Sequence, residues 1–241
     1  MSKLALITGA NKGIGLETAR QLGKLGIQVL IGARKPEAGE AAAAQLRGEG
    51  LKAQAVVIDV TSPPSIATAA SEVASKYQKL DILINNAGVL LDDTAKPPSA
   101  QSLDVWQRTF QANVFGLIAV TQAFLPLLRR APAARIVNLS SILASLALHA
   151  DPESPIYDSQ NAAYNASKTA VNAWTLSLAY ELRDTPIKVN AAHPGHVQTD
   201  MGGEDAPMEI TEGARTSVAL ATLGADGPSG SFSHLGNVLP W

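Results

Sequence analysis

Short apolar runs recur along the chain, at residues 4–8, 29–33, 55–59, 82–85, 135–139 and 188–192. They are rich in aliphatic and β-branched residues and do not alternate with polar positions, which is typical of strands buried on both faces of a parallel sheet. Segments of helical composition lie between the first four runs, at 14–25, 37–48 and 64–77. Ser62 is a candidate N-cap for the last of these, and the two prolines after it suit a first helical turn.

Two longer intervals precede the fifth and sixth runs and leave room for long helices near 105–129 and 162–183. Alternating strands and helices predict an α/β fold, a doubly wound Rossmann sheet that is mainly parallel and flanked by helices on both faces. The stretches 91–102 and 202–207 are interpreted as loops, and no repeat or linker interrupts the pattern. We therefore expect a single dinucleotide-binding domain over residues 1–241.

Composition narrows the function classes. Hydrophobic residues make up 46% of the 241 and charged residues 17%, against about 25% in an average domain, so much of the chain is expected to be buried or packed on a partner. A net charge of -2 gives no electrostatic reason to bind nucleic acid or an anionic membrane. The chain has no cysteine, which excludes disulfides, thiolate metal sites and a cysteine nucleophile.

The chain shows no obvious targeting segment. No apolar run approaches the roughly 18 residues of a membrane span, and the N-terminus begins directly with a strand-like run at 4–8 instead of a signal peptide. We therefore expect a cytoplasmic protein that binds no membrane.

The candidate for chemistry is the pair Tyr164 and Lys168, which are four residues apart. In a helix this spacing places both side chains on one face. An ammonium beside a phenol favours the phenolate and would lower the tyrosine pKa from its usual value of about 10 towards the range of an acid–base catalyst. Alone, the spacing is also compatible with a solvated helix face.

A glycine-rich turn follows the first strand, with Gly9, Gly13 and Gly15 at a strand-to-helix junction. Glycines here let the backbone approach a pyrophosphate, whose charge is stabilised at the helix N-terminus. A tight turn without a ligand is the alternative. Because the glycine turn lies directly after the first strand, we favour a bound dinucleotide.

The end of the second strand indicates which dinucleotide. A fold that prefers NAD usually has an acid there to bind the ribose 2′-hydroxyl. This chain instead has Ala33 followed by Arg34, which is placed to bind a 2′-phosphate, and Lys12 in the glycine turn adds a second cation. Both could also be ordinary surface cations. We expect NADP(H) as the cofactor.

Polar residues also follow the third and fourth strands. Asp59 could reach the adenine or could cap the turn into Thr61. The run from Asn85 to Gly88 ends the fourth strand with two amides and a small-residue turn, which suits the crevice where α/β folds bind ligands.

Taken in order, these motifs resemble the short-chain dehydrogenase/reductase family, from residue 3 to about residue 199. The resemblance rests on the glycine turn, Asp59-Val60, the Asn-Asn-Ala-Gly run, Asn113, Ser140-Ser141, Tyr164 with Lys168, and Pro194-Gly195. It implies that Tyr164 donates a proton to a carbonyl, or accepts one from an alcohol. It also implies that Lys168 holds the nicotinamide ribose and lowers the pKa of Tyr164.

The resemblance assigns two further catalytic residues. Ser141 would polarise the substrate oxygen. Ser140 is the alternative, and we choose Ser141 because the family generally uses the second serine of such a pair. Asn113 would anchor a water in a proton relay from Lys168, although it could instead be an N-cap or a satisfied buried amide.

The loop after the sixth strand would support the nicotinamide, with Val197 reaching the carboxamide through its backbone and Thr199 bonding the cofactor. His193 and His196 have no third ligand at metal spacing, so no metal is expected, and we place His196 at the mouth of the site. The full set of expected cofactor-binding residues is Gly9, Asn11, Lys12, Gly13, Ile14, Gly15, Arg34, Asp59, Val60, Asn86, Ala87, Gly88, Tyr164, Lys168, Pro194, Gly195, Val197 and Thr199.

One departure from the family is the insert 147–157 between Ser141 and Tyr164, which is similar to that of the carbonyl reductase branch. Larger inserts in that branch cover an oligomerisation face, so this intermediate one leaves monomer and homo-oligomer both open. We expect Tyr157 at the rim of the substrate pocket, or else packed on the helix below.

The sequence thus predicts an NADPH-dependent reductase of a small hydrophobic ketone or aldehyde. A catalytically silent NADP(H)-sensing regulator and an NADP-linked alcohol dehydrogenase are the alternatives. The apolar stretches 143–146, 201–208 and 239–241 are expected to shape the pocket.

Overall fold

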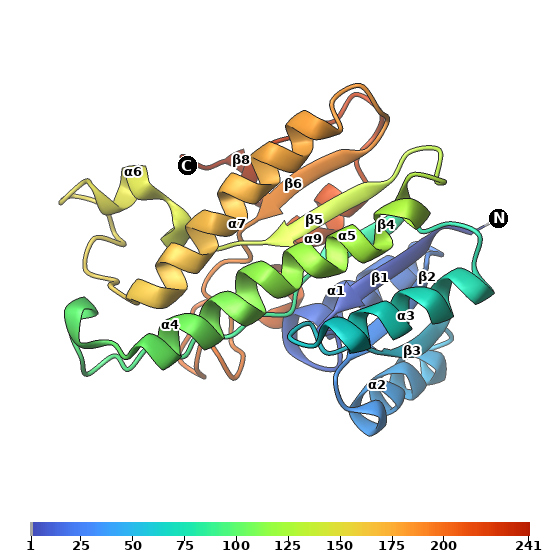
Figure 1. Cartoon of the computed structure of the whole chain (residues 1–241), viewed down its shortest axis with the longest axis horizontal. Coiled ribbons are helices and arrows are strands. Elements are labelled where there is room, and N and C mark those ends of the chain that lie inside the picture. Colours follow the sequence, from blue (N-terminus) through green and yellow to red (C-terminus); the bar gives the residue numbers. More distant parts are fainter. Residues whose placement is uncertain (1) are drawn as a thin grey trace.

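The computed structural model describes residues 2–241 and shows a single sheet with helices on both faces (Figure 1). Within those residues the sheet has eight strands in the order β3-β2-β1-β4-β5-β6-β7-β8. All neighbouring pairs are parallel except β7 and β8. The strands are β1 (Leu4–Thr8), β2 (Gln28–Ala33), β3 (Ala53–Val57), β4 (Ile82–Asn85), β5 (Arg135–Leu139), β6 (Lys188–Ala192), β7 (Phe232–His234) and β8 (Asn237–Val238).

The strand order reverses between β1 and β4, and this reversal determines where a ligand can bind. Chain connections leave β1 towards β2 on one side and return to β4 on the other. The loops at the carboxyl ends of β1 and β4 therefore diverge and leave a crevice, which is the general ligand site of open α/β sheets. The predicted doubly wound Rossmann fold is confirmed.

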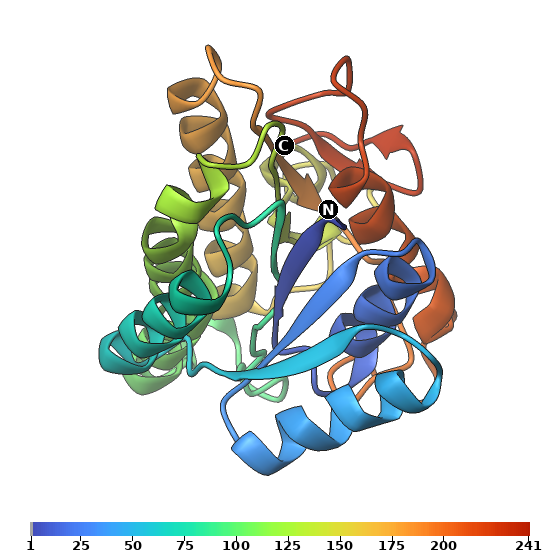
Figure 2. The same cartoon turned by 90° about the vertical axis from the view of Figure 1, so that its right-hand side faces the viewer.

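The helices form one layer on each face of the sheet, as Figure 2 shows. One layer contains α3 (Pro63–Lys76), α5 (Gly116–Leu128) and α7 (Ala162–Glu181), and the other contains α1 (Gly13–Lys24), α2 (Pro36–Gly48) and α9 (Arg215–Ala221). A hydrophobic core lies between the sheet and each helix layer, and alternate side chains of β1 pack into one or the other. Leu6 packs with the first layer and Ile7 with the second. A strand buried on both faces needs apolar residues at every position, which explains the continuous runs in the sequence.

Strand prediction succeeded best in the centre of the sheet, where the ranges 4–8, 82–85, 135–139 and 188–192 are the observed ones. The third strand lies two residues earlier than the predicted 55–59. As the edge strand it pairs only with β2, and after one last bond from the Ile58 N–H to the Ala33 oxygen the chain turns at Asp59. The short strands β7 and β8 and the helices α8 (Ile210–Gly213) and α9 were not predicted. Segments this short show no hydrophobic periodicity in the sequence.

Two helix predictions had different outcomes. Ser62 caps α3 as expected, since its hydroxyl accepts a hydrogen bond from the Ser65 N–H at 3.4 Å. The predicted helix 105–129 is instead α4 (Leu103–Phe110) and α5, joined by a π-helical turn, Gln111–Phe115. π-turns are uncommon and frequent at functional sites, and this one holds Asn113.

The stretch Leu103–Leu128 is long and apolar enough, by length and composition alone, to span a membrane, and its most apolar 18-residue window has a mean hydropathy of 1.4. The stretch is apolar on average, but polar residues such as Asp104 and Arg108 interrupt it, so it does not contradict the expectation that no apolar run approaches the length of a membrane span. More than half of its most apolar window, 56%, is buried within the fold. Burial of this kind is typical of a core helix.

The insert and the end of the chain contact each other. Helix α6 (Leu146–His149) leads into the insert, and the main-chain oxygen of Trp241 accepts hydrogen bonds from the Ala147 N–H at 3.1 Å and from the Ser145 hydroxyl at 3.2 Å. The Trp241 ring stacks on Phe232 of β7, with ring centroids 5.6 Å apart. The C-terminal residues therefore anchor the insert to the edge of the sheet.

Candidate active site

Tyr164 and Lys168 lie in the first turns of α7 and are both buried, with 8% and 5% of their surface exposed. The Lys168 ammonium lies 5.6 Å from the centre of the Tyr164 ring. It also donates a hydrogen bond of 2.8 Å to the carbonyl of Leu139, the last residue of β5. The helical spacing thus directs both groups to the carboxyl edge of the sheet, and the pair is not a solvated helix face.

Burial changes the proton affinity of both groups. It raises the pKa of Tyr164 to about 12, although the hydrogen bond with the Ser141 hydroxyl opposes this rise. It lowers the pKa of Lys168 to about 8. Removal from water disfavours the charged form of each group, so the phenol is held protonated and the ammonium gives up its proton more readily. The expectation that the lysine would lower the tyrosine pKa is wrong for the protein alone, because desolvation dominates.

The two serines at the end of β5 have different partners. The Ser140 hydroxyl donates a 2.6 Å hydrogen bond to the Asn172 side chain. This bond joins the end of β5 to α7. Ser141 is also buried, and its hydroxyl accepts a bond from the Leu143 N–H at 3.2 Å besides its interaction with Tyr164. Ser141 is therefore the serine that faces the tyrosine.

Asn113 ties the loop after β4 to α7. Its amide oxygen accepts from the Val89 N–H at 2.8 Å, and its amide nitrogen donates to the Val89 oxygen and to the Ser167 hydroxyl. A side chain added at Gly88 would lie 3.2 Å from the Asn113 oxygen and 3.5 Å from the Lys168 ammonium, so only glycine leaves the space between them open. Both N–H donors of the Asn113 amide are therefore used within the protein, and its side chain is a satisfied buried amide.

The glycine turn is held in shape by the Asn-Asn-Ala-Gly run. The Asn86 amide donates to the Thr8 and Gly9 carbonyls at 2.8 and 3.2 Å, and a Cβ at Gly15 would lie 2.5 Å from the same nitrogen. Helix α1 then begins at Gly13 with no side-chain cap and no acid in its first turn. Its first N–H groups are left for a ligand, so these residues fit a pyrophosphate.

The cations expected at a 2′-phosphate have different surroundings. Arg34 is exposed directly after β2 and, within residues 2–241, forms no hydrogen bond or ion pair. Lys12 pairs with Asp200, in the loop after β6, and both side chains are largely exposed. Asp59 accepts hydrogen bonds from the Thr61 N–H and hydroxyl at 2.9 and 2.7 Å. Its carboxylate therefore caps the turn into Thr61, the second of the two roles considered for it.

The two histidines after β6 hold backbone turns. The Nδ1 atom of His193 accepts hydrogen bonds from the N–H groups of Ile142 at 3.1 Å and Gly195 at 3.3 Å. Ring atoms of exposed His196 contact the Gly202 carbonyl at 2.8 Å. No group of three potential metal ligands occurs among the described residues.

The predicted cofactor residues that follow strands lie at one edge of the sheet, since the carboxyl ends of parallel strands share an edge. They come after β1 (Gly9, Asn11, Lys12, Gly13, Ile14, Gly15), β2 (Arg34), β3 (Asp59, Val60), β4 (Asn86, Ala87, Gly88) and β6 (Pro194, Gly195, Val197, Thr199). Their individual contacts with a cofactor stay predictions.

Sequence reasoning missed two residues of this site. Asp92, within the stretch interpreted as a loop, accepts hydrogen bonds from the first N–H groups of α7. His193 was considered only as a metal ligand or base. Neither role has a local sequence signal, because the partners of Asp92 lie 71 and 72 residues away along the chain and the Ile142 partner of His193 lies 51 residues away.

Comparison with known proteins shows the family of this chain. The family described as short chain dehydrogenase matches residues 3–210, and this chain belongs to it. The chain is 37% identical over 228 residues to a short-chain dehydrogenase of Penicillium roqueforti, covering 92% of this chain and 89% of the relative. It is 33% identical to carbonyl reductase (NADPH) 1 of Mus musculus over 276 residues, covering 99% and 98%.

Solved structures give the same assignment. NADPH-bound carbonyl reductase from chicken fatty liver superposes with a TM-score of 0.86 at 30% identity, covering 100% of this chain and 99% of that one. Salutaridine reductase from Papaver somniferum superposes with a TM-score of 0.82 at 27% identity, covering 95% and 99%. The predicted family and its carbonyl reductase-like character are confirmed.

Proposed function

We propose that this protein reduces the carbonyl group of a small hydrophobic ketone or aldehyde, using NADPH, with Tyr164 as the proton donor. The observation that carries the proposal is the buried pair of Tyr164 and Lys168 beside Ser141, at the sheet edge where the glycine turn leaves a helix N-terminus uncapped. Relatives described as NADPH carbonyl reductases cover nearly the whole chain.

The cofactor is NADP(H), as the sequence predicted. NADP or NADPH is named in several of the matching structures, and this chain has Ala33 where an NAD-dependent enzyme would have an acid, followed by the cation Arg34. When bound, this cofactor supplies the hydride, and the protein supplies orientation and electrostatics.

The residues of this chain perform the remaining steps. Ser141 donates a hydrogen bond to the substrate oxygen and holds it beside the phenol. Tyr164, kept protonated by burial at a pKa of about 12, gives its proton to the oxygen as negative charge develops there. Lys168 stabilises the resulting phenolate, and because burial lowers its pKa to about 8 it can pass on a proton near neutral pH. The relay then continues past Asn113 towards solvent.

Apolar side chains near the site favour a hydrophobic substrate. Leu146, directly before the insert, and Met201, in the loop after β6, expose 64% and 46% of their surface, respectively. Exposed groups of this kind would be buried by an apolar ligand, which favours its binding over that of a charged sugar.

Two alternative functions were considered. A silent NADP(H)-sensing regulator is not favoured, because Ser141, Tyr164, Lys168 and Asn113 are all present and the relatives are reductases and dehydrogenases. An alcohol dehydrogenase would use the same residues in reverse. Cytoplasmic location and oligomeric state stay predictions.

A panel of aliphatic and aromatic ketones and aldehydes, followed by NADPH absorbance, tests the proposed function. We expect steady oxidation of NADPH with at least one hydrophobic carbonyl compound and none without it. A protein that binds NADPH but reduces no member of the panel, and oxidises none of the corresponding alcohols, would contradict the proposal.

Cofactor selectivity gives a direct prediction. We expect kcat/KM to be at least about tenfold higher with NADPH than with NADH, since a charge-assisted bond from Arg34 to a 2′-phosphate contributes about 1.5–3 kcal/mol. The double variant Ala33→Asp/Arg34→Ala should reverse the preference. Lys35→Ala, which removes the neighbouring exposed cation, is the matched control and should leave it unchanged. Equal use of both cofactors by the wild-type protein would make Arg34 an ordinary surface residue.

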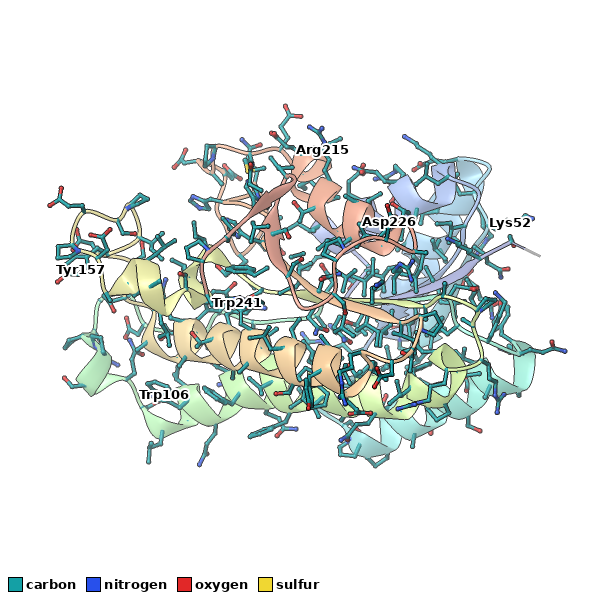
Figure 3. The ribbon with its side chains drawn as sticks, turned by 90° about the horizontal axis from the view of Figure 1, so that it is seen from above. Lys52, Trp106, Tyr157, Arg215, Asp226 and Trp241 are labelled. Carbon is teal, nitrogen blue, oxygen red and sulfur yellow. The ribbon has the colours of Figure 1, made fainter. Side chains whose placement is uncertain are left out.

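Tyr157 tests the role of the insert. Its side chain is 41% exposed and lies at the outer end of the insert in Figure 3, whereas the preceding Ile156 is buried. We expect Tyr157→Ala to change relative kcat/KM values among bulky ketones by several-fold without changing NADPH affinity. If the variant only melts at a lower temperature and keeps its substrate profile, Tyr157 has no part in substrate selection.

A further inference from the structure

Helix α7 is capped from a distant part of the chain. One carboxylate oxygen of Asp92, Oδ1, accepts a hydrogen bond from the Ala163 N–H at 2.8 Å, and the other, Oδ2, accepts one from the Tyr164 N–H at 3.0 Å. Asp92 lies seven residues after the end of β4 and exposes only 8% of its surface. A buried carboxylate with a helix N–H on each oxygen is a specific clamp, because such bonds are charge-assisted and directional.

The helix has no cap of its own. Asn161 occupies the N-cap position, yet its side chain accepts no hydrogen bond from the helix, and the first turn contains no acidic residue. A 20-residue helix with this start exposes unsatisfied N–H groups and the positive end of its dipole. Asp92 neutralises both, so the beginning of α7 depends on a loop that is 71 residues away in the sequence.

One of the two bonds is made to the main chain of Tyr164 itself. Four residues on, Lys168 is fixed by its 2.8 Å bond to the Leu139 carbonyl. The catalytic segment is thus held at one point by the loop after β4 and at another by the end of β5. Reacting groups must lie within about 0.5 Å of their productive position. A fixed main chain at Tyr164 therefore helps to hold the phenol where it can transfer its proton.

We propose that Asp92 is a positioning residue, which sets the place of the Tyr164 phenol relative to the substrate by clamping the first turn of α7 to the loop after β4. It touches neither substrate nor cofactor and acts through Tyr164. The effect on turnover rests on the proposed reductase function, whereas the clamp itself can be measured without any substrate.

Two substitutions remove the clamp in steps. Asp92→Asn keeps one acceptor oxygen but turns an NH₂ group towards the second N–H, and Asp92→Ala removes both acceptors. We expect kcat to fall about tenfold in Asp92→Asn and by about 10² in Asp92→Ala, the scale of a displacement near 1 Å. The dissociation constant of NADPH, measured by fluorescence, should change less than twofold, because the glycine turn and Arg34 are untouched.

A matched control separates positioning from loss of a helix cap. Ser62→Ala removes the cap of α3, where the serine hydroxyl accepts a single N–H bond. It should lower the melting temperature and leave kcat at saturating NADPH unchanged. A Ser62→Ala variant that loses as much turnover as Asp92→Asn would show that general destabilisation, not position, explains both results.

A second variant tests the clamp against a local cap. Asp92→Ala/Asn161→Asp restores a carboxylate at the start of α7 but not the tie to the loop after β4. We expect the melting temperature to recover while kcat stays low. Joint recovery of both would overturn the proposal, since Asp92 would then be a helix cap and nothing more.

Amide hydrogen exchange supplies the readout that needs no turnover. Exchange at the N–H groups of Ala163 and Tyr164 should accelerate at least tenfold in Asp92→Asn, with no change at the first turn of α3. If the wild-type protein reduces no carbonyl compound yet exchange accelerates, the proposed function fails and the clamp holds. If exchange is unchanged, the clamp itself is refuted.

Discussion

Replacing Tyr164 by phenylalanine is expected to reduce turnover by a factor on the order of 10² or more while leaving NADPH binding nearly intact. The phenol is buried, and burial raises its pKa to about 12, so at neutral pH it is a protonated group facing the Ser141 hydroxyl. Phenylalanine keeps the packing of the ring but has no proton to donate. The measurement is kcat with a hydrophobic ketone, together with the dissociation constant of NADPH.

The same helix offers a matched control for this substitution. Tyr180 is 69% exposed, and its ring contacts the Arg183 guanidinium at 4.1 Å on the outer side of α7. Tyr180→Phe should leave turnover unchanged. A Tyr164→Phe variant that keeps more than a tenth of the wild-type activity would remove Tyr164 from the role of proton donor.

The fold could be predicted because the central strands are buried on both faces. In β1, β4, β5 and β6 nearly every residue is buried and most are apolar, so a run of apolar residues and a strand coincide. The edge of the sheet was less predictable. Strands β7 and β8 have three and two residues, and they are specified by pairing with β6 and by the C-terminal contacts instead of by a local pattern.

The site could be predicted as far as its motifs are local. The spacing of Tyr164 and Lys168 and the glycine turn each fall within one element, and the structure brings them to the same edge of the sheet. The direction of the Tyr164 pKa could not be predicted, because it depends on how completely α7 and the loops around it exclude water. The role of Asp92 could not be predicted either, since it arises only when the loop after β4 meets the start of α7.

His193 leads to the largest expected effect on stability. Its Nδ1 atom accepts two backbone N–H bonds, so the ring is neutral in the folded protein. Burial, together with the His234 ring 4.8 Å away, lowers the pKa of His193 to about 3 from the usual 6.5. Between these two values the unfolded chain binds a proton that the folded chain does not, so the free energy of unfolding falls as the pH is lowered through this range.

The loss should reach several kcal/mol, at about 1.4 kcal/mol for each unit of pKa difference, and begin below about pH 6.5. His193→Asn removes the titrating group and retains an acceptor oxygen for the Ile142 and Gly195 N–H groups. We expect this variant to lose clearly less stability than the wild type between about pH 7 and pH 4, measured as free energies of unfolding in urea. His196→Asn, a change at an exposed histidine of the same loop, should follow the wild-type curve. Parallel curves for His193→Asn and the wild type would show that protonation of His193 is not what destabilises the fold in acid.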